Sequence, residues 1–279
     1  MWDMVSPLSM VFMAVTGLVC VLVPLGAMLG IWSRRDGSGS RRWPRVWRAF
    51  WCGALAFTVS QVLLRIPLMT LVVPQFPEPV AGFLLSGPMA SYTAGLFEET
   101  GRLVVMLLLL KAFHRWIDGV SFGLGHGGIE ATLIVGLSTV NNLVVATLIN
   151  TGQWDAVAAA LPAEQAAQIH GALVDTAPWM FLLAGVERLA AMTLHIACSL
   201  IVLAGIVHGR KLIAWIAAVV LHGTFNVVAV LMVGGGVSPL LIEAVLVALA
   251  LGLWVGIVRS RPAFPTEITS EVAPAPRVG

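Results

Sequence analysis

Two adjacent glutamates and an arginine lie inside a hydrophobic stretch, where charged side chains require a physical reason. Glu98 and Glu99 are followed by Arg102 within the largely apolar run from residue 90 to 110. Residues three and four apart share one side of a helix, so the arginine can pair with one glutamate while the other faces a cavity. The unpaired glutamate is then a candidate general base and the paired one a structural anion. The alternative is that all three charges only bridge helices.

A histidine and an acid stand four residues apart in the next hydrophobic stretch. His126 and Glu130 share a helical face, where they can bind a metal ion, orient a water molecule or hold two helices together. Several glycines precede them, Gly123 and Gly125 among these, and their small size allows another helix to approach closely.

A third stretch carries Glu187, Arg188 and His195. Glu187 and His195 are two turns apart, about 12 Å along a helix axis, so an unbroken helix cannot bring both to one small ion. One of them therefore has a supporting role. Arg188 is the natural partner of Glu187 or of an acid on a neighbouring helix.

A fourth stretch contains His222 and Asn226, which share a helical face. The imidazole can bind a metal or a water molecule, and the amide can donate a hydrogen bond to the oxyanion formed when a peptide carbonyl is attacked. The spacing alone is a weak pattern. Its weight comes from four predicted helices that each carry a polar residue near the centre: Glu99, Glu130, His195 and His222. We therefore predict one shared polar site inside a bundle.

The composition indicates that these elements are membrane spans. Hydrophobic residues make up 58% of the chain, charged residues 11%, and the mean hydropathy is +0.93. Runs of about 20 apolar residues can cross the bilayer as helices. We predict an all-α, polytopic membrane bundle of about seven transmembrane helices, near residues 6–32, 46–73, 90–113, 119–149, 177–207, 212–234 and 237–258.

The positions of the basic residues predict the orientation of the bundle. With the N-terminus outside, every connection that contains Lys or Arg is cytoplasmic and the outer connections contain none, as the positive-inside rule requires. We predict one transmembrane domain over residues 1–260, with its polar site on the helices within 90–234, and a disordered cytoplasmic tail over 261–279. The net charge of +2 is too small and too localised to indicate binding of nucleic acid.

The ordered set of motifs resembles a known family. These motifs are Phe97-Glu98-Glu99-Thr100-Gly101-Arg102, Gly125-His126-Gly127-Gly128-Ile129-Glu130-Ala131, Glu187-Arg188 running to His195, and His222 with Asn226. The chain is similar to the YhfC family of bacterial intramembrane proteases, which is related to the PrsW and CAAX-processing/bacteriocin-immunity membrane proteases. The resemblance implies a multi-pass protein of the bacterial plasma membrane. It also implies a glutamate-dependent peptidase that cuts a protein or peptide substrate within or near the bilayer.

Under this resemblance we expect Glu98 or Glu99 to activate water, with Arg102 keeping the other glutamate ionised. His195 and His222 would hold the water, either directly or through a divalent cation, and Asn226 would stabilise the oxyanion. Zn²⁺ is the usual ion for such ligands, and a metal-free site is the alternative. The candidate metal ligands are His126, Glu130, His195 and His222, with Glu187 and Arg188 in supporting roles. Two other classes stay open, a membrane transporter and a non-catalytic scaffold or immunity protein.

Overall fold

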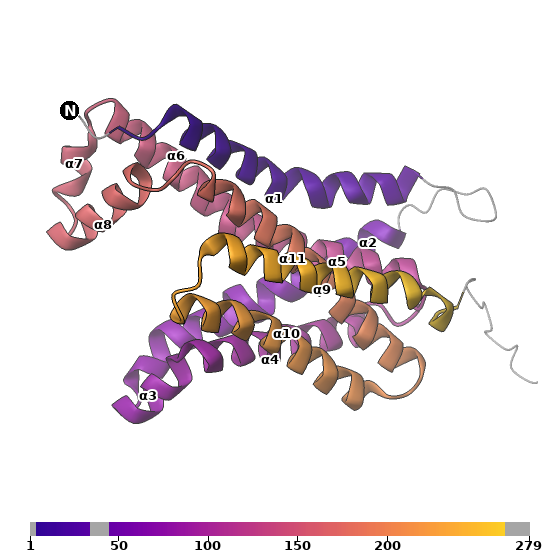
Figure 1. The fold of residues 1–279 in the computed structure, drawn as a ribbon. Coiled ribbons are helices and arrows are strands. Elements are labelled where there is room, and N and C mark those ends of the chain that lie inside the picture. Colours follow the sequence, from indigo (N-terminus) through magenta and orange to yellow (C-terminus); the bar gives the residue numbers. More distant parts are fainter. Residues whose placement is uncertain (1–3, 34–44, 266–279) are drawn as a thin grey trace, which may run out of the picture.

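The structure, a computed structural model, describes residues 4–33 and 45–265, and every regular element in these ranges is a helix (Figure 1). The α-helices are α1 Pro7–Ser33, α2 Arg45–Phe57, α3 Glu78–Leu85, α4 Gly87–Leu109, α5 Trp116–Glu130, α6 Leu137–Asn150, α7 Trp154–Ala158, α8 Ala163–Val174, α9 Met180–Val207, α10 Lys211–Gly234 and α11 Pro239–Arg259. The prediction of an all-α fold is confirmed.

The number of spans also agrees with the prediction. Within the described residues, six helices are long and apolar enough to cross a membrane, and α3 with α4 makes a seventh if this pair, bent by 68°, is one span. Ser86 separates α3 from α4 because its extended backbone (ψ 146°) interrupts the helical path. Several predicted helices contain wider turns. The span that begins with α2 continues through the π-helical segments Thr58–Arg65 and Leu68–Val72, and α5 is joined to α6 by the π-helical segment Ala131–Gly136.

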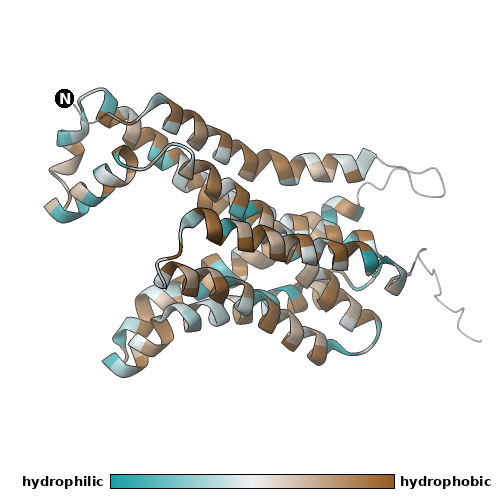
Figure 2. Ribbon diagram, viewed as in Figure 1, coloured by the Kyte–Doolittle hydropathy of each residue, from teal (hydrophilic) through white to brown (hydrophobic). Residues whose placement is uncertain are grey.

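Helix α9 forms the centre of the bundle. It packs against α1, α4, α5, α10 and α11. Of its most apolar 18 residues, 67% are buried, against 28% or less for the other five helices that are long and apolar enough to span a membrane. The helices consist largely of hydrophobic residues (Figure 2). Many of these side chains are exposed at the surface, including those of Leu63, Leu108, Leu212 and Ile213. An apolar exterior around a packed centre suits a bundle surrounded by lipid.

Glycines of α5 allow two neighbouring helices to approach its backbone. A Cβ atom at Gly123 would lie 2.4 Å from the Cα atom of Ile196 in α9, and one at Gly125 would lie 1.8 Å from the carbonyl oxygen of Phe50 in α2. Both separations are shorter than real carbon contacts, so only glycine fits these positions without a backbone shift. The predicted close approach is confirmed, and it places His126 between α4 and α9.

The ends of the helices that precede or follow basic connections meet at one end of the bundle. Arg48 at the start of α2 donates to the carbonyl oxygen of Leu109 at the end of α4, at 2.9 Å. Trp116 at the start of α5 donates to the carbonyl oxygen of Ile257 near the end of α11, at 3.0 Å. These contacts are consistent with the alternation on which the predicted orientation depends.

Parts of the predicted cytoplasmic segments lie outside the described residues, namely the connection over residues 34–44 and residues 266–279 of the tail. The beginning of the predicted tail is structured, since Arg261–Ala263 forms a short 3-10 helix and Phe264 is buried.

Candidate active site

The two glutamates of α4 have different partners. Glu98, Glu99 and Arg102 are all buried, with at most 3% of each residue exposed. Arg102 donates from Nε to Glu99 Oε2 at 2.7 Å and from Nη2 to Glu99 Oε1 at 3.1 Å. This bidentate pair is the strong form of an arginine–carboxylate contact. Arg102 thus pairs with Glu99 and leaves Glu98 for a different partner.

Arg102 also connects α4 to α9. Its Nη1 atom donates to the carbonyl oxygen of His195 at 3.2 Å and to the hydroxyl of Ser199. Ser199 is fully buried and donates in turn to the carbonyl oxygen of His195 at 2.7 Å. The sequence reasoning missed Ser199. The available signal was its position one helical turn after His195, which places both residues on the same face.

Glu98 lies between two histidines of other helices. Its Oε2 atom is 3.0 Å from Nε2 of His126 in α5 and 4.0 Å from Nε2 of His222 in α10. The other ring nitrogen of His222, Nδ1, is 2.9 Å from Glu99 Oε1. His222 therefore faces one glutamate with each of its nitrogens.

Three imidazole rings gather next to the glutamate pair. The ring centroids of His126 and His195 are 4.6 Å apart, and those of His195 and His222 are 5.1 Å apart. No more than 2% of any of these residues is exposed. Side chains of α4, α5, α9 and α10 thus meet in one buried group, the polar cluster of Glu98, Glu99, Arg102, His126, His195 and His222.

His126 and Glu130 do not act as the pair that their spacing allows. Although both side chains lie on one face of α5, His126 turns to Glu98 and Glu130 turns to α9. Glu130 Oε1 accepts a hydrogen bond from Arg188 at 2.9 Å, and Oε2 lies 2.5 Å from His195 Nε2. The reason is electrostatic, because α9 offers the carboxylate the guanidinium of Arg188, and a charged donor is a stronger partner than the imidazole of His126. The ring of His195 adds a second contact from the same helix.

Glu187 and Arg188 lie at the edge of the polar cluster. Arg188 binds Glu187 as well as Glu130, so it has both of the partners that its position suggested. The side chain of Glu187 is 40% exposed and forms an ion pair with Arg188. Asn226 is half-buried, one helical turn beyond His222, and makes no hydrogen bond with any of the described residues. The structure therefore does not join Asn226 to the network.

The donor atoms of the cluster fit a divalent cation. Two overlapping groups have ligand atoms within 4.8 Å of one another, Glu98 with His126 and His195, and Glu99 with His195 and His222. Nitrogen and carboxylate oxygen are the ligands that zinc takes beside sulfur. Glu130, a predicted ligand, belongs to neither group.

Within the part of the chain that the structure describes, the group of Glu98, His126 and His195 has more ligand atoms without a hydrogen-bond partner than the group of Glu99, His195 and His222. The Nδ1 atom of His126 is buried without a hydrogen-bond partner among the described residues. Both oxygens of Glu99, in contrast, already accept hydrogen bonds from Arg102, and Oε1 also faces His222. Both ring nitrogens of His195 are engaged, by Arg102 and by Glu130, so a cation held by His195 would replace one of these contacts.

Comparison with known proteins assigns the chain to a family. The family described as YhfC intramembrane metalloprotease matches residues 19–247. The chain is also similar to the uncharacterized membrane protein YhfC of Bacillus subtilis (strain 168), with 34% identity over 254 residues that cover 90% of this chain and 95% of the relative. No solved structure matches the chain. The match spans all four helices of the polar cluster, and we conclude that this multi-pass membrane protein belongs to the YhfC intramembrane metalloprotease family.

Proposed function

We propose that this chain is an intramembrane endopeptidase of the bacterial plasma membrane, in which Glu98 activates the water that hydrolyses a peptide bond. The observation that carries the proposal is the unequal partnership of the two glutamates. Arg102 binds both oxygens of Glu99, whereas Glu98 meets His126 and His222. A carboxylate without an arginine partner, placed beside imidazoles in a buried group, is suited to accept a proton. Membership of a metalloprotease family supports the same reaction.

In the proposed reaction, Glu98 accepts a proton from a water molecule whose oxygen attacks the carbonyl carbon of the substrate. The carbon–nitrogen bond then breaks, and the proton passes from Glu98 to the leaving amine. The products are a carboxylic acid and an amine, and Glu98 is again a carboxylate. His126 and His222 flank Glu98 and would orient the water.

The oxyanion formed by this attack needs a hydrogen-bond donor. The Asn226 side-chain amide has no partner among the described residues and lies one turn from His222. It can therefore donate to the developing negative charge, a role in which one donor contributes about 2.7–4 kcal/mol. We therefore include Asn226 in the proposal as the hydrogen-bond donor to the oxyanion.

The remaining polar residues would position the reacting groups. From the α4 side, Arg102 contacts His195 and Glu99 contacts His222. Glu130, held by Arg188, orients His195 from the side of α5. Ordered contacts of this kind fix the ring orientation of functional histidines. Glu187 supports Arg188.

A divalent cation, with zinc the usual ion for such ligands, would be held by His126, His195 and one carboxylate oxygen of Glu98, which would leave the other oxygen of Glu98 for the proton transfer. When bound, it would polarise the substrate carbonyl and lower the pKa of its water toward about 7. In the metal-free alternative, Glu98 performs the proton transfer alone. Metal content and cleavage measured together in the purified protein separate the two versions, because a fully active preparation without metal removes the ion from the proposal.

The proposed activity is tested by comparing membrane peptide fragments from cells that produce the native chain or the Glu98→Gln variant. A matched control is Glu243→Gln, the same substitution in α11, outside the polar cluster. We expect a substrate fragment with the native chain and the control, and its loss with Glu98→Gln. Identical fragments from all three chains would overturn the proposal, and a change in ion or solute transport instead would favour a transporter.

A further inference from the structure

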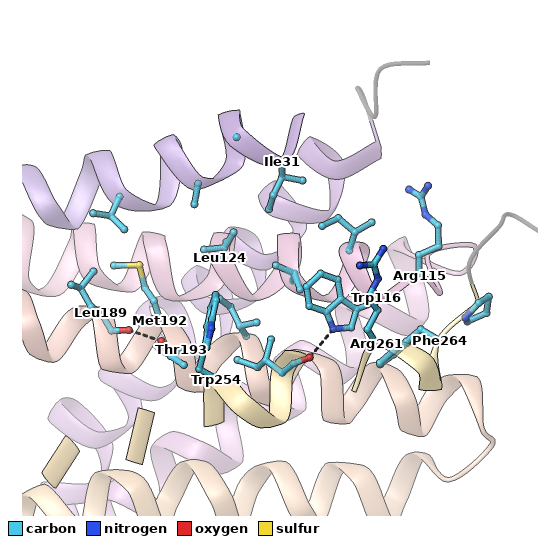
Figure 3. A pocket seen from close by; sticks show the side chains of 18 residues that line it. Ile31, Arg115, Trp116, Leu124, Leu189, Met192, Thr193, Trp254, Arg261 and Phe264 are labelled. Carbon is cyan, nitrogen blue, oxygen red and sulfur yellow. Dashed lines mark hydrogen bonds between the residues drawn. The ribbon is translucent and has the colours of Figure 1, made fainter. Parts of the chain in front are cut away.

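A large apolar cavity lies among α1, α5, α9 and α11 (Figure 3). Its volume is about 740 Å³, within the range of about 300–1,000 Å³ typical of small-molecule sites. The wall is formed mainly by hydrophobic side chains, among them Val23, Leu124, Met192, Ile196 and Trp254. The cavity could therefore hold an apolar ligand of substantial size.

The cavity is separate from the polar cluster. None of the residues of that cluster lines it. Leu124 and Met192 face the cavity from α5 and α9, and these helices meet through Gly123, where the backbones touch too closely for a side chain. The contact between α5 and α9 thus forms a wall between the two sites.

The cavity is accessible from the lipid phase. Helices α1 and α11 line two of its sides but do not pack extensively against each other within the described residues. Lining residues of both helices are exposed at the protein surface, Val23 by 39% and Trp254 by 52%. In a bilayer, this surface would face acyl chains.

One end of the cavity carries positive charge. Figure 3 shows Arg115 and Arg261 beside Trp116, at the end of the bundle where the basic connections meet. Arg115 shares a single carboxylate, Asp118, with Arg45, so these three residues leave a net positive charge. Arg261 is exposed and forms no ion pair with any described residue. By the positive-inside rule this end faces the cytoplasm.

We infer that this cavity binds an anionic phospholipid of the cytoplasmic leaflet, with an acyl chain among α1, α5, α9 and α11 and the phosphate at Arg115 and Arg261. Basic pockets between helices on the cytoplasmic side of a membrane favour anionic headgroups. The inference is independent of the proposed peptidase activity.

The lining favours an acyl chain over a peptide. The Trp116 indole nitrogen already donates to Ile257, and the Thr193 hydroxyl already donates to Leu189. An inserted peptide would bring backbone N–H and C=O groups without partners, and each such group costs several kcal/mol in an apolar environment. A hydrocarbon chain brings no such groups.

Native mass spectrometry of the purified full-length chain tests the inference, with dioleoyl phosphatidylglycerol and dioleoyl phosphatidylcholine offered in equal amounts. Gly30→Phe fills the cavity, because Gly30 lines it and a Cβ atom there would meet nothing within 4 Å. Gly26→Phe is the matched control, since Gly26 has the same open surroundings on α1 but does not line the cavity. Arg261→Gln removes one headgroup contact.

We expect the native chain and Gly26→Phe to retain phosphatidylglycerol in preference to phosphatidylcholine, and Gly30→Phe to lose the bound lipid. Arg261→Gln should weaken the preference about fivefold, the factor for one basic residue near an anionic surface. Equal retention of both lipids, an unchanged adduct in Gly30→Phe, or a peptide in place of the lipid would overturn the inference. Thermal unfolding of both phenylalanine variants checks that they fold. If Gly30→Phe does not fold, the result for Arg261→Gln decides the outcome.

Discussion

Arg102 binds both carboxylate oxygens of Glu99, at 2.7 and 3.1 Å, while the adjacent Glu98 meets His126 of another helix. Two identical side chains, neighbours in the chain, are thereby placed in different chemical environments. Glu99 is paired with an arginine, which is always positively charged, whereas Glu98 is paired with a histidine, whose charge depends on its protonation. This difference is the basis of the separate roles that we propose for them.

Replacing each glutamate by glutamine should therefore have different effects. Glu99→Gln leaves the guanidinium of Arg102 buried without its counter-ion, which typically destabilises a protein by about 3–5 kcal/mol. Glu98→Gln should leave stability nearly unchanged and reduce cleavage by about 10²–10⁴-fold, the usual contribution of a general base. Thermal unfolding of the purified variants, with peptide cleavage measured in parallel, checks both outcomes. Equal loss of stability in the two variants would contradict the unequal partnership.

Ser199→Ala should weaken the hold of α9 on Arg102. The Ser199 hydroxyl accepts a hydrogen bond from this buried guanidinium, and hydrogen bonds to charged groups contribute about 1.5–3 kcal/mol. The matched control is Ser121→Ala, because Ser121 is equally buried but its hydroxyl, among the residues that the structure describes, bonds only to the carbonyl oxygen of Ile117 in its own helix. Thermal unfolding should show a clearly larger loss for Ser199→Ala. Similar losses in both variants would mean that the contact with Arg102 adds nothing.

Mutation can test whether the metal ligands include His126 and exclude Glu130. His126→Ala should abolish bound metal, whereas Glu130→Gln should retain it, because Glu130 lies outside both groups of converging ligand atoms. His170→Ala on α8, remote from the polar cluster, serves as the control and should match the native chain. Elemental analysis of the purified proteins by mass spectrometry gives the metal content directly. Loss of metal in Glu130→Gln as great as in His126→Ala would make Glu130 a ligand after all.

Gly125→Ala should destabilise the bundle because its Cβ atom would lie 1.8 Å from the Phe50 carbonyl oxygen. Forcing extra volume into such a contact typically costs about 1–3 kcal/mol. Gly26→Ala is the control, since a Cβ atom at Gly26 meets nothing within 4 Å. Thermal unfolding should show a lower midpoint for Gly125→Ala, and Gly26→Ala should unfold at the same temperature as the native chain. An unchanged midpoint would mean that α2 and α5 can separate at no cost.

The sequence by itself determined the helices, the number of spans and the types of residue in the polar site. Long apolar runs act locally along the chain, so the helices that they form can be predicted without knowing the neighbours. The meeting of polar residues from four helices, for which the sequence singled out Glu99, Glu130, His195 and His222, could also be anticipated. A charged or polar residue at the centre of an apolar helix must turn toward other polar groups.

Only the tertiary structure decided which partners were chosen. Spacings of three and four residues allow Arg102 to bind either glutamate and allow His126 to bind Glu130. The choice depended on what the facing helices offered: α9 presented Arg188 and His195 to Glu130, and α5 presented His126 to Glu98. The position of Ser199 beneath Arg102 and the cavity beside α1 likewise arise from the packing of segments far apart in the chain. Such contacts leave no periodic signal in the sequence, because each depends on the relative placement of whole helices.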